Sequence, residues 1–202
     1  MKRNYFLAAT VAIAAGVMVT GCGGGKMALE STTGQKKIEQ DICEQLQEEK
    51  PALRAVGIGQ HFQESTARNI AEAQARAQFA RALSSKVKTA TTSEASSYTV
   101  SSSDLATGNS ISDQIAKTNS FVDAAANEVV AGTVPIKISK YMLSNNQYKV
   151  YVCLEYQKGV SELAAEVAKR VEQKIPDEQK HKMNFEFEQY RKRIEAELEK
   201  SK

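Results

Sequence analysis

The chain has 202 residues and contains no tryptophan, only three prolines and only two histidines. Without tryptophan, a stacking platform for carbohydrate is not expected, and so few prolines exclude a proline-rich linker. The formal net charge is +3 at pH 7, with no basic stripe of interleaved aromatic residues, so nucleic acid is not an expected partner. Beyond residue 21, no apolar run approaches the about 20 residues that a membrane-spanning helix needs.

The first 22 residues carry the pattern of a secretion signal. Lys2 and Arg3 are positive, residues 5–19 are apolar and rich in small side chains, and the run ends in Val19-Thr20-Gly21-Cys22. This order of charged, apolar and small residues is typical of a secretory signal peptide. The apolar run is too short for a comfortable spanning helix. A cysteine stands where the mature chain would begin.

The ending Val19-Thr20-Gly21-Cys22 resembles the lipobox of bacterial lipoproteins. The resemblance implies removal of residues 1–21, a thioether-linked diacylglycerol on Cys22, and acylation of the freed amine, with palmitate as the expected acyl group. The alternative is an uncleaved anchor or a signal peptide that happens to hold a cysteine. Gly23 stands where such lipoproteins carry an aspartate for inner-membrane retention. The resemblance therefore implies an outer-membrane, lipid-anchored protein that faces the periplasm.

If Cys22 carries lipid, Cys43 and Cys153 are the two cysteines that are left, and only one pairing is possible. The compartment outside the cytoplasmic membrane is oxidising and would allow a disulfide between them. A bond that closes so long a loop contributes about 4 to 5 kcal/mol in the chain-entropy picture. The alternative is two unrelated thiols that each fill apolar space.

Composition along the chain predicts four segments. They are a lipoprotein signal peptide over 1–21, a lipidated flexible tether over 22–35, an α+β domain over 36–158, and a helical C-terminal extension over 159–202. The three glycines after Cys22 are the reason for predicting a tether. No internal repeat is visible.

Apolar spacing predicts the first half of the domain. We expect a short helix over 36–49 that ends before Pro51, then a strand over 53–60. An alanine-rich helix follows, with Ser65 or Thr66 as its N-cap. In the Ser/Thr-rich segment over 84–104 we expect this helix to fade into flexible chain, and short strands over 86–92 and 98–101 are the alternative. A second helix is expected from Ser112 or Asp113 to Gly132.

A hairpin is the clearest signal in the second half. Apolar residues alternate over 134–143 and 147–156, with Ser144-Asn145-Asn146 as the turn. The alternation predicts one buried face and one partly wet face. The residues of the wet face are Lys149, Tyr151, Cys153 and Glu155. Helices are expected over 160–175 and 183–198.

The predicted fold class is α+β. One N-terminal strand and the hairpin form a small, mostly antiparallel three-stranded sheet. Long helices pack on one face of it, and the helical extension follows.

The domain also shows an ordered series of short motifs. They are Val56-Gly57-Ile58-Gly59, Ala67-Arg68, Ala75-Arg76-Ala77, Leu83, the Ser/Thr-rich segment, Val130-Ala131-Gly132 and Tyr148-Lys149-Val150-Tyr151-Val152. This order is similar to that of the lipoprotein-20 family, relatives of flagellar-assembly lipoproteins. The resemblance implies a non-enzymatic, outer-membrane-associated envelope protein and supplies no catalytic residues. The helices beyond Val160 depart from the family pattern.

No motif predicts a catalytic, metal or cofactor site. Gly57-Ile58-Gly59 lacks the third glycine of a dinucleotide motif, because Phe62 stands there, and the glycines are expected instead to allow close backbone approach. His61 and His181 have no ligand spacing around them and are expected to be solvated side chains.

These observations predict a non-catalytic, lipid-anchored lipoprotein with a structural or assembly role in the cell envelope, of the flagellar-apparatus type. Its expected partners are membrane lipid, through the acyl anchor, and envelope proteins or further copies of itself, through helices 159–202. The alternative function is binding of a small ligand in a pocket between the sheet and the helices.

Overall fold

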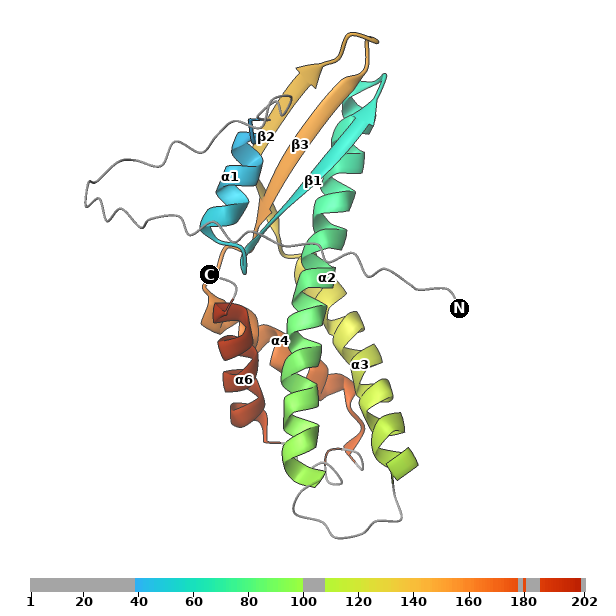
Figure 1. Ribbon diagram of the computed structural model, residues 1–202, viewed down its shortest axis with the longest axis vertical. Coiled ribbons are helices and arrows are strands. Elements are labelled where there is room, and N and C mark those ends of the chain that lie inside the picture. The colour runs from blue at the N-terminus through green and yellow to red at the C-terminus, as the bar shows by residue number, and fades with distance from the viewer. Residues whose placement is uncertain (1–38, 100–107, 178–179, 181–185, 201–202) are drawn as a thin grey trace, which may run out of the picture. The chain divides into compact units, whose positions relative to one another are not determined.

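The computed structural model describes residues 39–99, 108–177, 180 and 186–200, and the side chains of residues 93–115 are not described (Figure 1). The helices are α1 (Ile42–Glu49), α2 (Glu64–Thr99), α3 (Gly108–Val130), α4 (Val160–Lys174) and α6 (Phe187–Glu199). The strands are β1 (Arg54–His61), β2 (Val134–Met142) and β3 (Tyr148–Glu155). The predicted α+β class, with one strand and a hairpin in the sheet, is confirmed.

The three strands form one antiparallel sheet in the order β1-β3-β2. The hairpin between β2 and β3 closes where the Leu143 amide donates to the Gln147 carbonyl at 2.8 Å, with Asn146 at a φ of 59°. Asparagine tolerates this left-handed conformation better than most residues, which explains its place in the turn.

Both outer strands carry features that discourage pairing with another chain. On β1, the Ile58 amide donates to the side-chain oxygen of Gln74 from α2 at 3.0 Å. On β2, a register irregularity lies between Pro135 and Lys137. Proline lacks the amide that a further strand would need, so its position agrees with an edge strand.

The buried apolar contact of α2 with one face of the sheet is made by alanines. Ala67, Ala71 and Ala75 are fully buried and share a cluster with Val150, Val152 and Leu154 of β3. At Gly57 and Gly59 of β1 the backbones nearly touch, because a methyl group at either position would overlap the carbonyl oxygen of Ala71 or Ala67. The predicted role of these glycines, close backbone approach, is confirmed.

The other half of α2 belongs to a helical core that it forms with α3, α4 and α6 (Figure 1). Its largest buried residues are Phe79, Leu83, Val87, Val122, Val129, Leu163, Val167, Val171, Tyr190, Ile194 and Leu198. The Tyr190 hydroxyl lies 3.0 Å from the hydroxyl of Thr91, so this buried phenol has a polar partner inside the core.

The C-terminal helices differ from the extension expected over 159–202. The apolar faces of α4 and α6 are buried in the same core as α2 and α3, and the chain from Glu39 onward forms one compact unit. The boundary expected after residue 158 does not separate two units. Local periodicity identified these helices, but it carries no information about which surface covers them.

The hairpin face expected to be partly wet is covered by α1. Tyr151 is only 9% exposed and Cys153 is fully buried, in a cluster with Cys43 and Val56. Leu46 of α1 also packs against this cluster. The expectation of a wet face is wrong at these two residues, because a short amphipathic helix supplies the second apolar layer.

Helix ends account for the other differences from the sequence. Helix α2 begins at Glu64, so Ser65 and Thr66 lie in its first turn and neither is the N-cap. It continues unbroken to Thr99, so the expectation that it fades into flexible chain after residue 84 is wrong as far as residue 99, and so is the alternative of a strand over 86–92. Helix α3 begins at Gly108, earlier than Ser112. Helix boundaries are the least reliable part of pattern reading.

Three hydrogen bonds fix the start of α1. The Asp41 carboxylate accepts from the Cys43 amide at 2.7 Å, and Glu44 accepts from the Asp41 amide, which completes a capping box. The Tyr141 hydroxyl of β2 donates to the other Asp41 oxygen at 2.6 Å. Burial opposes ionisation of Asp41, but the bonds from Tyr141 and Cys43 outweigh it, and the pKa of Asp41 is lowered.

We predict that Gly57→Ala and Gly59→Ala each lower the free energy of unfolding by about 3 kcal/mol, because the added methyl group forces α2 away from β1. Gly132→Ala is the matched control. Its methyl group would meet nothing closer than the Val129 carbonyl oxygen at 3.4 Å, so we expect a change within about 0.5 kcal/mol. Denaturant titration measures all three. Equal stability of the Gly57 variant and the control would contradict the close approach.

We predict that Tyr141→Phe lowers the free energy of unfolding by about 1 kcal/mol at neutral pH. The folded pKa of Asp41 lies below its unfolded value, so this contribution is present above about pH 4 and disappears as the pH falls further. Urea titrations of Tyr141→Phe and of the parent, at neutral pH and below about pH 4, measure the difference in the free energy of unfolding. Tyr148→Phe, which removes a hydroxyl from the neighbouring strand without touching Asp41, is the control. A difference between Tyr141→Phe and the parent that persists in acid would exclude Asp41 as the partner.

Candidate functional site

The residues singled out in the sequence fall into two groups. Cys22, its preceding signal, the tether and His181 lie outside the described residues. Cys43, Cys153, His61, Gly57 and Gly59 are all described. Of these five residues, Cys43 and Cys153 lie in one cluster of buried side chains.

Cys43 of α1 and Cys153 of β3 share one buried cluster, and both are free thiols. The Cys43 sulfur lies 3.7 Å from the Lys137 carbonyl oxygen and 3.8 Å from the Ser139 hydroxyl, and the Cys153 sulfur lies 3.9 Å from the Leu154 carbonyl oxygen. The disulfide expected between them is therefore not present. Each sulfur fills apolar space and makes weak polar contacts, which is the alternative that the sequence left open.

The environment of both thiols makes them unreactive. Burial is the largest cause that raises the pKa of Cys43, and burial followed by the neighbouring Cys43 raises the pKa of Cys153 to about 11. Because the thiolate is the nucleophile and the metal ligand, thiols in this state are poor at both tasks. The cluster joins α1 to the sheet and has no catalytic features.

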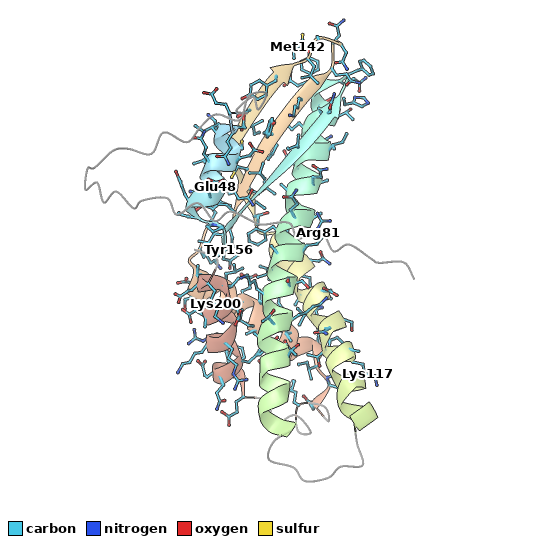
Figure 2. The ribbon with its side chains drawn as sticks, in the orientation of Figure 1. Glu48, Arg81, Lys117, Met142, Tyr156 and Lys200 are labelled. Carbon is cyan, nitrogen blue, oxygen red and sulfur yellow. The ribbon has the colours of Figure 1, made fainter. Side chains whose placement is uncertain are left out.

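A cleft of about 510 Å³ between α2 and α3 is the strongest candidate for a binding site. Ala77, Ala80, Arg81, Ser84, Ser85, Lys88, Asp123 and Asn127 line it. Figure 2 labels Arg81, which projects from α2 beside this region. The Ser84 hydroxyl donates to Asp123, and the Lys88 ammonium lies 2.7 Å from the same carboxylate.

The chemistry of this cleft favours a clamp between helices over a catalytic centre. The hydrogen bond from Lys88, followed by that from Ser84, lowers the pKa of Asp123. A carboxylate with a lowered pKa is a weak base, so it cannot take the proton of Ser84 at neutral pH and make a nucleophile of it. The three side chains instead satisfy one another and hold α2 against α3.

A smaller cleft lies where the sheet meets the helices, the place where the alternative function required a pocket. Its volume is about 260 Å³, below the about 300 to 1,000 Å³ of most ligand pockets. Arg54 at its wall already donates to Glu155, Glu49 and the Leu46 carbonyl. That guanidinium is therefore committed to acceptors of the protein itself.

A polar network ties α3 to α4 beside the helical core. The Tyr156 hydroxyl donates to Glu166 at 2.6 Å, and Arg170 bridges Glu166 and Glu128. Burial, followed by the bond to Glu166, raises the pKa of Tyr156, while the bonds from Tyr156 and Arg170 lower the pKa of Glu166. The pairing keeps the phenol protonated and the carboxylate ionised, which suits a structural contact.

His61 and the glycines show no ligand-binding features. The His61 Nδ1 accepts from the Gln63 amide at 3.0 Å, so that nitrogen is occupied by its own turn. The backbone of α2 fills the space beside Gly57 and Gly59 where a phosphate would have to lie. Across the described ranges, no group of three or more His, Cys, Asp and Glu side chains is arranged to hold a metal.

The sequence missed the contact of Ser84 and Lys88 with Asp123. Ser84 and Lys88 stand four apart on a predicted helix, which places them on one face. Asp123 lies on the next predicted helix, but no pattern within either helix specifies that these faces meet.

No helix within the described part of the chain is both long enough and apolar enough to cross a membrane. No protein-family model, curated protein or solved structure matches the chain. The resemblance to the lipoprotein-20 family therefore stays a prediction from the residues between Ala55 and Tyr156.

We predict that the two described thiols of the native chain react with a thiol reagent about a hundredfold more slowly than in denaturant, because both are buried and weakly ionised. In denaturant without reductant, the chain acylated at Cys22 should release two thiols per molecule, since Cys43 and Cys153 are both free. Cys153→Ser should lower the count to one. A chain that releases none would hold the disulfide after all.

Proposed function

We propose that this protein is a non-catalytic lipoprotein, anchored by lipid on Cys22 to the outer membrane, with a structural or assembly role in the cell envelope. The single observation that carries the proposal is the unbroken order of charge, apolar run and Val19-Thr20-Gly21-Cys22 at the N-terminus. The positive residues, the apolar run and the small residues before a cysteine are each common, but in this order they match a signal peptide that is removed before Cys22. Gly23, in place of aspartate, favours the outer membrane.

The positions of the other cysteines support this assignment. Cys43 and Cys153 are fully buried inside the unit that begins at Glu39. They are therefore closed to an acyl-transferring enzyme unless the unit unfolds. Cys22 stands ahead of that unit in the chain, so modification there leaves the fold intact.

The pairing of the polar and charged side chains with one another supports a structural role. The polar groups with the clearest geometry pair with one another, as in the clamp of Ser84, Lys88 and Asp123, and stabilise contacts between helices. A catalytic site instead keeps its groups poised towards a substrate. The lipoprotein-20 resemblance, through its flagellar-assembly relatives, favours an assembly role in the same way.

Contacts with envelope proteins or further copies would use the charged outer faces of the C-terminal helices. The apolar faces of α4 and α6 are already buried, so truncation would expose core residues such as Ile194 and confuse unfolding with loss of a partner. A shallow groove over α4, lined by Lys158, Glu162, Lys169 and Phe187 among others, is the surface to alter by substitution.

We predict that Cys22→Ser abolishes acylation and releases the protein from the membrane fraction, because the lipid is the proposed anchor. Intact mass and fractionation measure the two effects. Cys43→Ser, which alters a buried thiol only, should keep both the acyl mass and the membrane location. Gly23→Asp should move the acylated protein to the inner membrane.

Two outcomes would contradict the proposal. One is a parent chain whose mass includes residues 1–21. The other is a mature chain with an unmodified Cys22, since either leaves the protein without its acyl anchor.

A further inference from the structure

Exposed apolar side chains gather at one end of the sheet. In the described part of the chain six large hydrophobic residues are exposed, and the two most exposed are Phe62 at 63% and Met142 at 64%. Tyr141 is 48% exposed and Ile42 is 47% exposed. These four side chains, which we call the sheet tip, lie within a few residues of the ends of β1, β2 and α1.

Strand register places Met142 in one row with His61, the residue that precedes Phe62. His61, Tyr148 and Met142 form the last row across the three strands, and neighbouring strands lie about 4.8 Å apart. The Phe62 ring contacts the His61 ring edge-on, with centroids 6.4 Å apart. Figure 2 shows Met142 at the hairpin end of the sheet, the end at which α2 begins.

Tyr141 lies in the preceding row and is linked to the start of α1. Its hydroxyl donates to Asp41, and Ile42 is the next residue along the chain. The first described residue, Glu39, stands two positions before Asp41. The segment that joins Cys22 to the folded unit therefore enters it at the sheet tip.

The far end of the unit lies a long way from this entry point. Helix α2 begins beside the tip at Glu64 and runs for 36 residues, about 54 Å. The flexible tether that the sequence predicts after Cys22 has an r.m.s. span to Glu39 of about 20 to 25 Å, less than half the length of α2. An acyl anchor on Cys22 thus keeps the tip as the part of the unit that meets the bilayer most readily.

We propose that the sheet tip is a second membrane contact, which docks on the phospholipid surface that holds the acyl chains; this rests on the proposed lipid anchor. Phe62 and Met142 reach the boundary between headgroups and acyl chains, and Tyr141 stays at the level of the headgroups, where tyrosine is enriched. Lys140 and Lys149 flank these residues. They supply positive charge towards anionic headgroups, although Lys140 also pairs with Glu64 and Lys149 lies 4.8 Å from the Tyr151 ring centre.

The absence of tryptophan allows a direct test. The full acylated chain carrying Phe62→Trp is reconstituted into phosphatidylcholine–phosphatidylglycerol vesicles, with and without bromine on the acyl chains. We expect brominated lipid to lower the tryptophan emission about twofold, because quenching needs contact at the depth of the acyl boundary. Met142→Trp is a second probe of the same tip, in case Phe62→Trp does not fold.

Val134→Trp is the matched control. Val134 is 39% exposed but pairs with Glu155 at the other end of the sheet. Its emission should be the same in brominated and plain vesicles. If the emission of the tip probes is equal in brominated and plain vesicles, the proposal is wrong. This holds even if the emission is shifted to the blue, because a blue shift without quenching indicates burial of the tryptophan against protein.

Intact mass, measured before reconstitution, separates this proposal from the anchor. An acylated chain whose tip probe is not quenched overturns docking and leaves the anchor standing. A chain with a bare Cys22 overturns the anchor, and quenching of its tip probe on added vesicles then supports docking by the tip alone.

Discussion

The fold depends on the close approach of α2 to β1. Gly57 and Gly59 present no side-chain atom to α2, and Ala67, Ala71 and Ala75 present only methyl groups to the strand. Contact at this distance leaves no room for adjustment, because packed backbones cannot yield as side chains do. It fixes the direction in which α2 leaves the sheet and hence the position of everything that α2 carries.

One long helix then serves two cores. Its first half closes the sheet, and its second half gathers α3, α4 and α6 around Leu83 and Val87. The C-terminal helices are consequently part of the fold, since Tyr190 bonds to Thr91 and Ile194 is fully buried. A surface for partners has to be sought on charged faces and at the sheet tip.

The polar side chains serve the same architecture. The groups around Asp123 clamp α2 to α3, those around Glu166 tie α4 to α3, and Asp41 with Tyr141 holds α1 over the sheet. Each set satisfies its own polar groups by hydrogen bonds or ion pairs within the fold. A body built in this way is compatible with the structural role that we propose for it.

The sequence by itself determined the elements and the proposed anchor. Alternation identified the hairpin, alanine spacing identified α2, and Gly57 and Gly59 indicated close packing, because each signal depends on neighbours within a few positions. The tertiary structure alone decided that α1 covers Tyr151 and Cys153, that these cysteines stay free, and that α4 and α6 join the core. It also decided that Met142 shares the last row of the sheet with His61, the residue before Phe62. Such outcomes depend on contacts between residues far apart in the chain, and no local period encodes them.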